Sequence, residues 1–356
     1  MQIDKYEQFS DIVQLIKNTQ TNALKMINTE LINLYWCVGQ YISKQLSNAN
    51  WGDKTVDELA NFILKEYPEI KGFNRRGLYR MKKFYEIYSQ MTFVTSAMTQ
   101  NQISDNKNDM IVSSLMSQLE IDDLRNSILV KVSWTHHLVL ISRTQTDEER
   151  EFYLHLTIQE KYSSRELERQ INSSIYERTM LGNTKLSAVL RETRPNVNNV
   201  FKDNYVLEFL GLPESHLEGD IQKGLVNQMK NFILELGKDF LFIGEEYRVQ
   251  VGNSDFYIDL LFYHRGLQCL VAFELKADKF KPEHLGQLTF YLEALDRDVK
   301  KPTENPSIGI LLCKDKDNEV VEYALSRYLS PTMIAEYQTQ LPDKTVLQNK
   351  LRELLE

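Results

Sequence analysis

The stretch that decides the fold covers residues 252–295 and reads GNSDFYIDLLFYHRGLQCLVAFELKADKFKPEHLGQLTFYLEAL. Its first part alternates apolar and polar residues with a period of two, which predicts a half-buried β-strand. We expect one apolar face on this strand, formed by Phe256, Ile258, Leu260 and Phe262. After a turn at 264–266, a second apolar run over 267–276 predicts an antiparallel partner strand.

Three charged side chains lie on the polar side of this predicted hairpin: Asp259, Glu274 and Lys276. Carboxylates on neighbouring strands repel each other unless a cation lies between them. Their oxygen ligands suit Mg²⁺ or Mn²⁺, which keep several waters and leave room for a phosphate oxygen. Lys276 would then either orient a water or offset charge developing at phosphorus. The alternative is that all three are solvent-facing charges of an amphipathic sheet.

The segments after the hairpin predict the rest of a layered sheet. Residues 282–295 carry a leucine stripe, and Gln287 lies on an adjoining polar face, where it serves either the site or contact with solvent. The run SIGILLC at 307–313 predicts a strand buried on both faces. Residues 319–328 predict an amphipathic helix, which we expect on the opposite face of the sheet.

The 356 residues favour two domains. Apolar residues recur three and four apart in the first half, whereas strand-length runs alternate with helical segments in the second. We therefore expect an α+β or α/β multidomain chain with the following parts: a helical N-terminal domain over 1–185 with a flexible insertion at about 90–122, a linker over 186–200, an α/β domain over 201–345 and a C-terminal helical tail over 346–356.

The phrases DFYIDLLFYHRGLQCLVAFELKADKFKPEHLGQLTFYLEALD and PSIGILLCKDKDNEVVEYAL resemble the C-terminal domain of the bacterial YhcG-like family. NTELINLYWCVGQYI, WGDKTVDELA, GFNRRGLYRMKKFYEIY and VSWTHHLVL resemble that family's helical N-terminal domain. The resemblance covers nearly the whole chain. It implies a PD-(D/E)XK restriction-endonuclease-like α/β domain that follows a winged helix-turn-helix-like domain.

The hairpin likewise resembles the core of the PD-(D/E)XK nuclease superfamily. The resemblance implies that Asp259, Glu274 and Lys276 are the catalytic set and that the two acids bind the metal ion. Ile258 stands where the motif's often substituted proline would be. Gln287 falls where the superfamily often carries a polar helix residue beside the active site.

Some superfamily members supply one more metal-binding glutamate from the helix before the first strand. Glu218 is the candidate for this role here, and Glu235 is the alternative. The sequence does not place either residue relative to Asp259.

Residues 71–83, KGFNRRGLYRMKK, hold six basic residues and no acid. Together with a helix expected over 55–67, the segment resembles a helix-turn-helix with a basic second helix. We expect nucleic-acid contacts from Arg75, Arg76, Arg80, Lys82 and Lys83. The alternative is a solvated or protein-binding face, because no base-reading residue is identifiable.

Composition narrows the class of protein. A formal charge of -8 argues against a chain that binds nucleic acid through its overall charge. A local basic face is compatible with that charge. Three scattered cysteines support neither disulfides nor a zinc site. No stretch approaches the ~20 apolar residues of a membrane span, and the N-terminus does not resemble a secretory signal. We expect a soluble cytoplasmic protein without membrane contact.

These observations predict an enzyme, a Mg²⁺- or Mn²⁺-dependent endo- or exodeoxyribonuclease. Its substrate would be DNA, in DNA processing or in defence against foreign DNA, with RNA left open. The competing hypothesis is a noncatalytic nucleic-acid-binding or complex-forming protein that retains the nuclease fold. A homo-oligomer or a protein partner is compatible with either hypothesis.

Overall fold

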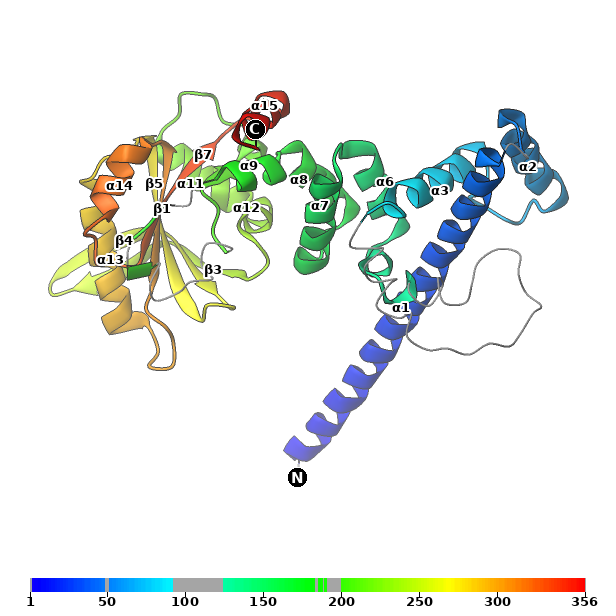
Figure 1. The fold of residues 1–356 in the computed structure, drawn as a ribbon. Helices are drawn as coiled ribbons and strands as arrows, with labels where there is room; N and C mark the ends of the chain where they lie inside the picture. Colours follow the sequence, from blue (N-terminus) through cyan, green and yellow to red (C-terminus); the bar gives the residue numbers. More distant parts are fainter. Residues whose placement is uncertain are drawn as a thin grey trace, which may run out of the picture. The chain divides into compact units, whose positions relative to one another are not determined.

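The computed structural model of the chain describes residues 2–48, 51–91, 124–182, 185–187, 189–190 and 200–355. It contains two compact units, 1–168 and 169–356 (Figure 1). The division falls within helix α8, Ser164–Asn172. The insertion expected at about 90–122 lies almost wholly outside the described residues, as does most of the expected linker. The expected domain bounds stay a prediction.

The regular elements described in the first unit are all helices. Its elements are α1 (Gln2–Ser47), α2 (Asp53–Glu66), α3 (Arg75–Tyr88), η1 (Ile128–Lys131), α6 (Trp134–Arg143), α7 (Asp147–Glu160) and the start of α8. The Asn74 side chain caps α3 by accepting a hydrogen bond from the Gly77 amide at 2.9 Å. The apolar sides of α1, α2 and α3 share one core, which includes Ile42, Val56, Ala60, Leu78 and Met81.

The second unit is built on a mixed sheet. In the described residues the sheet has seven strands, in the order β1-β7-β6-β5-β4-β3 with β2 beside β7. Antiparallel pairing joins β3 to β4 and β4 to β5, whereas β5, β6 and β7 are parallel. The expected hairpin is thereby confirmed. The strands are β1 (Lys185–Leu186), β2 (Asn204–Val206), β3 (Phe240–Val251), β4 (Ser254–His264), β5 (Cys269–Lys279), β6 (Ile308–Asp315) and β7 (Thr332–Gln338).

Helices cover both faces of this sheet. One face packs against α11 (Glu218–Asn227) and α12 (Met229–Leu236), and the other against α13 (His284–Ala294) and α14 (Asn318–Leu325). The elements that complete the unit are α9 (Ile175–Leu181), η3 (Glu208–Leu210), η4 (Leu295–Val299) and α15 (Lys344–Leu355). None of the described helices combines the length and the apolar composition that crossing a membrane requires.

The position expected for the helix at 319–328 was wrong. Val321 of α14 belongs to the same core as Leu288 of α13, so both helices lie on one face. The chain steps from β5 to β6 and then to β7 in the same direction across the sheet. Since both crossovers join parallel strands and such crossovers are right-handed, their helices fall on the same side.

The single apolar face expected for β4 was also wrong. Ile258 packs on the α13 side of the sheet, whereas Leu260 and Phe262 pack on the α11 side. The alternation breaks at Asp259, next to an irregular part of β3. There Glu246 has a φ of +41°, and the β3–β4 register shifts between Phe242 and Gly244. Such an irregularity redirects side chains that a regular strand would keep on one face.

Candidate active site

Strands β4 and β5 separate at Asp259. Their ladder runs from the pair of His264 with Cys269 to the pair of Leu260 with Phe273. Beyond it, the Leu275 amide of β5 donates a hydrogen bond to Asp259 Oδ2 at 2.8 Å. The Asp259 carboxylate therefore replaces a strand carbonyl as acceptor, which fixes it against β5.

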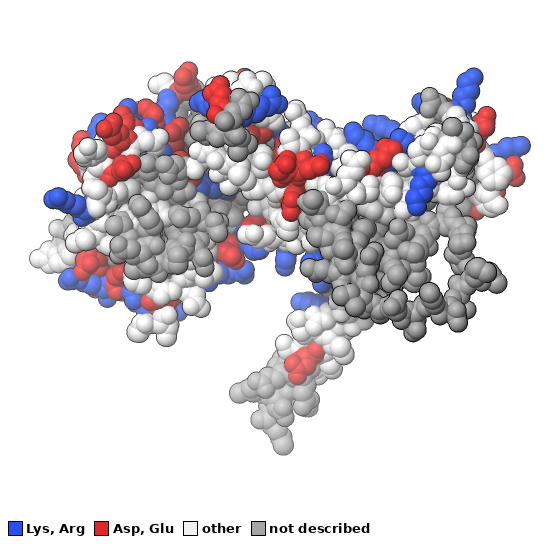
Figure 2. Space-filling model, in the orientation of Figure 1, with Lys and Arg blue, Asp and Glu red and all other residues white. Residues whose placement is uncertain are grey.

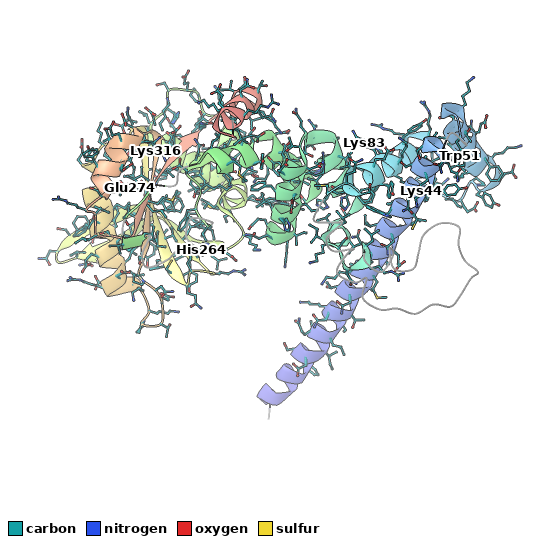
Figure 3. All side chains as sticks on the ribbon, viewed as in Figure 1. Lys44, Trp51, Lys83, His264, Glu274 and Lys316 are labelled. Atoms are coloured by element: carbon teal, nitrogen blue, oxygen red, sulfur yellow. The ribbon has the colours of Figure 1, made fainter. Side chains whose placement is uncertain are left out.

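Glu274 and Lys276 lie on β5 beside this point, and Glu274 is labelled in Figure 3. Lys276 Nζ is 2.9 Å from Glu274 Oε1 and 3.4 Å from Glu218 Oε2 of α11. Glu274 is only 2% exposed, and its Oε2 is buried without a hydrogen-bond partner among the described residues. The structure thus brings together Asp259, Glu274, Lys276 and Glu218.

The positive charge near Asp259 and Glu274 does not balance the burial and mutual repulsion of their carboxylates. Burial, and then the Asp259 carboxylate, raise the pKa of Glu274 to about 7 although Lys276 opposes them. Burial also raises the pKa of Asp259, where the Leu275 amide and Lys276 act in the opposite direction. Glu246 of β3 adds to the rise at Asp259. A further cation would therefore stabilise both carboxylates.

The donor set fits a hard divalent cation. Asp259 and Glu274 present carboxylate oxygens, and one buried Glu274 oxygen lacks a donor among the described residues. Within those residues, no three His, Cys, Asp or Glu side chains are grouped as metal ligands. The Lys276 ammonium group pairs with both Glu274 and Glu218 and supplies positive charge there.

Gln287 of α13 reaches this region through Tyr291. Its Nε2 donates to the Tyr291 hydroxyl at 2.6 Å. Burial raises the pKa of Tyr291, Gln287 acts against the rise, and Glu274 and Asp259 add to it. The spacing of four residues places Tyr291 on the same helix face as Gln287 in the sequence, but sequence reasoning gave Tyr291 no part in the site. Glu246 was missed as well, since it looks like an ordinary charge on an exposed strand.

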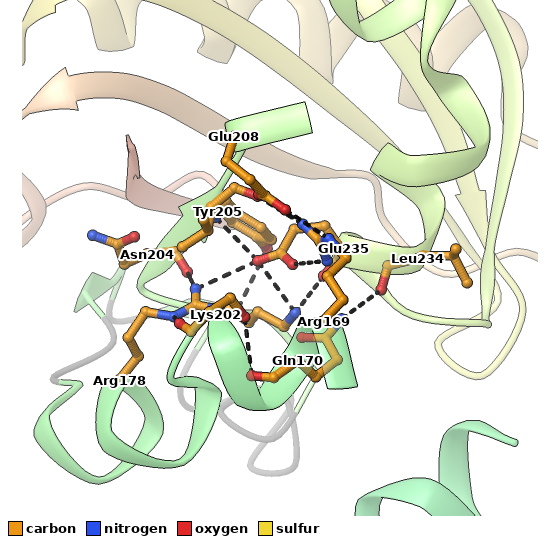
Figure 4. A network of polar contacts seen from close by, with 11 residues as sticks. Arg169, Gln170, Arg178, Lys202, Asn204, Tyr205, Glu208, Leu234 and Glu235 are labelled. Carbon is orange, nitrogen blue, oxygen red and sulfur yellow. Dashed lines mark hydrogen bonds and ion pairs between the residues drawn. The ribbon is translucent and has the colours of Figure 1, made fainter. Parts of the chain in front are cut away.

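Glu235, the alternative to Glu218, lies in a different network (Figure 4). It is wholly buried, and its carboxylate oxygens are 3.0 Å from Arg169, 3.4 Å from Arg178 and 3.5 Å from Lys202. It also accepts a hydrogen bond from the Val206 amide at 3.1 Å. The structure therefore brings Glu218, and not Glu235, to Lys276.

Two family models match this chain. Residues 198–352 match the model of the YhcG PDDEXK nuclease domain, and residues 11–178 match that of the DUF1016 N-terminal domain. The chain is 30% identical to the Escherichia coli (strain K12) protein "Putative nuclease YhcG", over 97% of this chain and 93% of that protein. The chain belongs to the YhcG family. The resemblance drawn from the sequence is confirmed, as is a helical region followed by a PDDEXK nuclease-like domain.

The YhcG nuclease-domain match includes all the acids and the lysine of the site, together with Gln287. A likeness to a solved structure is much slighter. A repair endonuclease from Pyrococcus abyssi is 15% identical, with a TM-score of 0.24 over 37% of this chain and 50% of that one. This likeness is too slight to bear on fold or activity.

The basic residues of the YhcG-family helical region separate into two groups. Arg75 is 2.5 Å from Asp57, and Lys82 is 2.9 Å from Glu86, so both are neutralised locally. Arg76, Arg80 and Lys83 are exposed and have no ion-pair partner in the described part of the chain. Figure 2 shows acidic and basic side chains interspersed on the face in view.

Proposed function

We propose that this chain is a metal-dependent nuclease that hydrolyses phosphodiester bonds in DNA, with RNA as the alternative substrate. DNA processing or defence against foreign DNA would be its setting. One observation carries the proposal: Asp259 and Glu274 lie beside Lys276, with a buried Glu274 oxygen that lacks a donor among the described residues. Membership of a nuclease family supports it further.

Each residue of the site has a separate task in this mechanism. Asp259 and Glu274 would hold Mg²⁺ or Mn²⁺, which would acidify water and polarise phosphate oxygens when bound. The Leu275 amide keeps Asp259 in position. Lys276, fixed 2.9 Å from Glu274, donates a hydrogen bond to the attacking water or to a phosphate oxygen that gains charge. Gln287 of α13 has a positioning task, through the hydrogen bond that it donates to Tyr291.

The test is a cleavage assay of the purified full-length chain. Linear, circular, single-stranded and branched DNA, and a matched RNA, are each incubated with Mg²⁺, with Mn²⁺ and with EDTA. We expect cleavage of at least one DNA substrate with either ion and none in EDTA. Undiminished cleavage in chelator contradicts the metal mechanism. Binding without cleavage of any substrate favours the noncatalytic hypothesis. Cleavage of RNA but of no DNA would mean that RNA, and not DNA, is the substrate.

Metal binding should release a proton below neutral pH. The Glu274 pKa of about 7 means that much of this carboxyl is protonated in the free chain at pH 6, and a ligand carboxyl has to be ionised. Mg²⁺ affinity should therefore rise about tenfold per pH unit up to roughly pH 7 and then level off. Calorimetry in two buffers of different ionisation enthalpy measures both the affinity and the proton. An affinity that is independent of pH from 5 to 8 contradicts this prediction.

The unpaired cations of α3 should hold the nucleic-acid backbone. Replacing Arg76, Arg80 and Lys83 by Glu should weaken DNA binding and reduce the dependence of log Kd on log salt, by about 0.9 per lost duplex phosphate contact. Fluorescence anisotropy over a salt series measures both quantities. Metal affinity at Asp259 and Glu274 should not change.

The control makes the same change in net charge elsewhere, with Lys301, Lys350 and Arg352 replaced by Glu. These three side chains are exposed and lie in the second unit. We expect their replacement to alter DNA affinity much less. Equal losses in both triple variants would mean that α3 acts only through overall charge.

A further inference from the structure

Helix α1 carries an exposed apolar stripe. With 3.6 residues per turn, eight large apolar residues between positions 9 and 34 fall on one side of the helix. Each is between 40% and 68% exposed. We call these residues the α1 stripe: Phe9, Ile12, Val13, Ile16, Leu24, Ile27, Leu31 and Leu34.

Among the described residues, the core that α1 shares with α2 and α3 includes no member of the α1 stripe. The opposite side of α1 makes the packing contacts, where Ile32 and Trp36 are buried. The Trp36 ring lies 5.8 Å from that of Phe84 and 5.0 Å from that of Tyr85, both on α3. C-terminal to Leu34, the side of α1 that carries the stripe is packed within the unit, because Ile42 belongs to the core shared with α2 and α3. The stripe is therefore a second apolar surface on the same helix.

We propose that the α1 stripe pairs with the α1 stripe of a second copy of this chain, forming a two-stranded coiled coil. Positions 9, 13, 16 and 20 follow one another in steps of four and three, as do positions 24, 27, 31 and 34. This spacing is that of coiled-coil core positions. The additional step of four from 20 to 24 is a stutter, which locally unwinds the supercoil.

The size and charge of the surface favour a second copy as the occupant. From the exposed fractions, the stripe offers roughly 700 Å² per chain, near the ~800 Å² per partner of a standard interface. Residues 9–34 contain two acids and two bases, so two copies do not repel each other by net charge.

Gln20 adds a reason for self-pairing. Gln20 is the one polar residue among the eight proposed coiled-coil core positions, and it lies between Ile16 and Leu24. Its amide both donates and accepts hydrogen bonds, so the Gln20 side chains of two copies can satisfy each other. A polar residue at a single core position also fixes register in coiled coils.

The test compares two double variants of the full-length chain. Ile16→Glu with Ile27→Glu puts charges into the stripe, whereas Asn18→Glu with Asn22→Glu puts the same charges on the other side of α1, where both residues are exposed. Light scattering after size-exclusion chromatography gives the mass over a concentration series. We expect the mass of two chains for wild type and for the Asn variant. The Ile variant should have the mass of one chain, with a dimer Kd raised more than ~100-fold.

Far-UV circular dichroism and thermal unfolding of the full-length chain check that both variants remain folded. A one-chain mass for wild type at every concentration overturns the proposal. So does a two-chain mass for the Ile variant, which would place the interface elsewhere. A wild-type complex that contains a different protein in place of the second copy also overturns it.

Discussion

Replacing Lys276 by Ala should lower the rate of DNA cleavage by about 100- to 1,000-fold while metal binding persists. Its ammonium group contacts Glu274 and Glu218 but supplies no oxygen ligand. Asp259→Asn and Glu274→Gln should lose metal affinity and cleavage together, because each removes a charged oxygen donor. Calorimetry with Mg²⁺ or Mn²⁺ measures binding, and single-turnover kinetics measure the chemical step.

Lys279→Ala is the matched control for this experiment. It lies on the same strand, three residues further on, and is paired at 3.8 Å with the exposed Asp315. We expect this variant to cleave DNA at nearly the wild-type rate. If Lys276→Ala loses metal binding as severely as Asp259→Asn, Lys276 acts by holding the acids. If Lys276→Ala cleaves normally, the lysine has no role in the reaction.

Replacing Glu235 by Ala should destabilise the second unit by about 3 to 5 kcal/mol. The change leaves Arg169, Arg178 and Lys202 without the buried carboxylate that neutralises them, and it removes the acceptor for Val206. Equilibrium urea unfolding measures the loss. The control is Glu208→Ala, whose carboxylate is 21% exposed and pairs with Arg169, and which should cost less than Glu235→Ala because Arg169 keeps its pair with Glu235.

The same network predicts a dependence of stability on pH. Burial acts to raise the pKa of Glu235, but Lys202, Arg178 and Arg169 together outweigh it and lower the pKa to about 2. Because the folded pKa lies below the unfolded value of 4.5, this stability is present above pH 4.5 and is lost as the pH falls toward 2. Glu235→Gln should remove this part of the pH dependence. If Glu235→Gln loses stability between pH 4.5 and pH 2 as the wild type does, the pH dependence does not come from Glu235.

Local sequence patterns were sufficient to predict much of the secondary structure of the second unit. The period of two predicted the hairpin of β4 and β5, and the continuous apolar run of β6 predicted a strand buried on both faces. These features depend on residues close in sequence, where side-chain alternation and burial follow directly from strand geometry.

The remaining features depend on long-range packing. Choosing Glu218 over Glu235 required the position of α11 beside β5, which brings together residues 58 apart in sequence. The face covered by α14 required the strand order, and the pairing of Arg75 with Asp57 required the packing of α2 against α3. The pair of Lys82 with Glu86, by contrast, spans four residues of one helix, a spacing that the sequence itself shows. The switch of faces at Asp259 arises from β3, whose backbone at Glu246 follows from no residue-type preference.

The irregular backbone of β3 also affects how the chain resists aggregation. β3 ends the strand order of the sheet in the described residues, and it exposes Leu241, Phe242 and Ile243 along its 12 residues. A straight apolar edge of this kind would be a template for strands of other molecules. The register shift and the left-handed conformation of Glu246 interrupt that template, and charged side chains follow immediately. An edge interrupted in this way offers only a short apolar segment to a strand of another molecule.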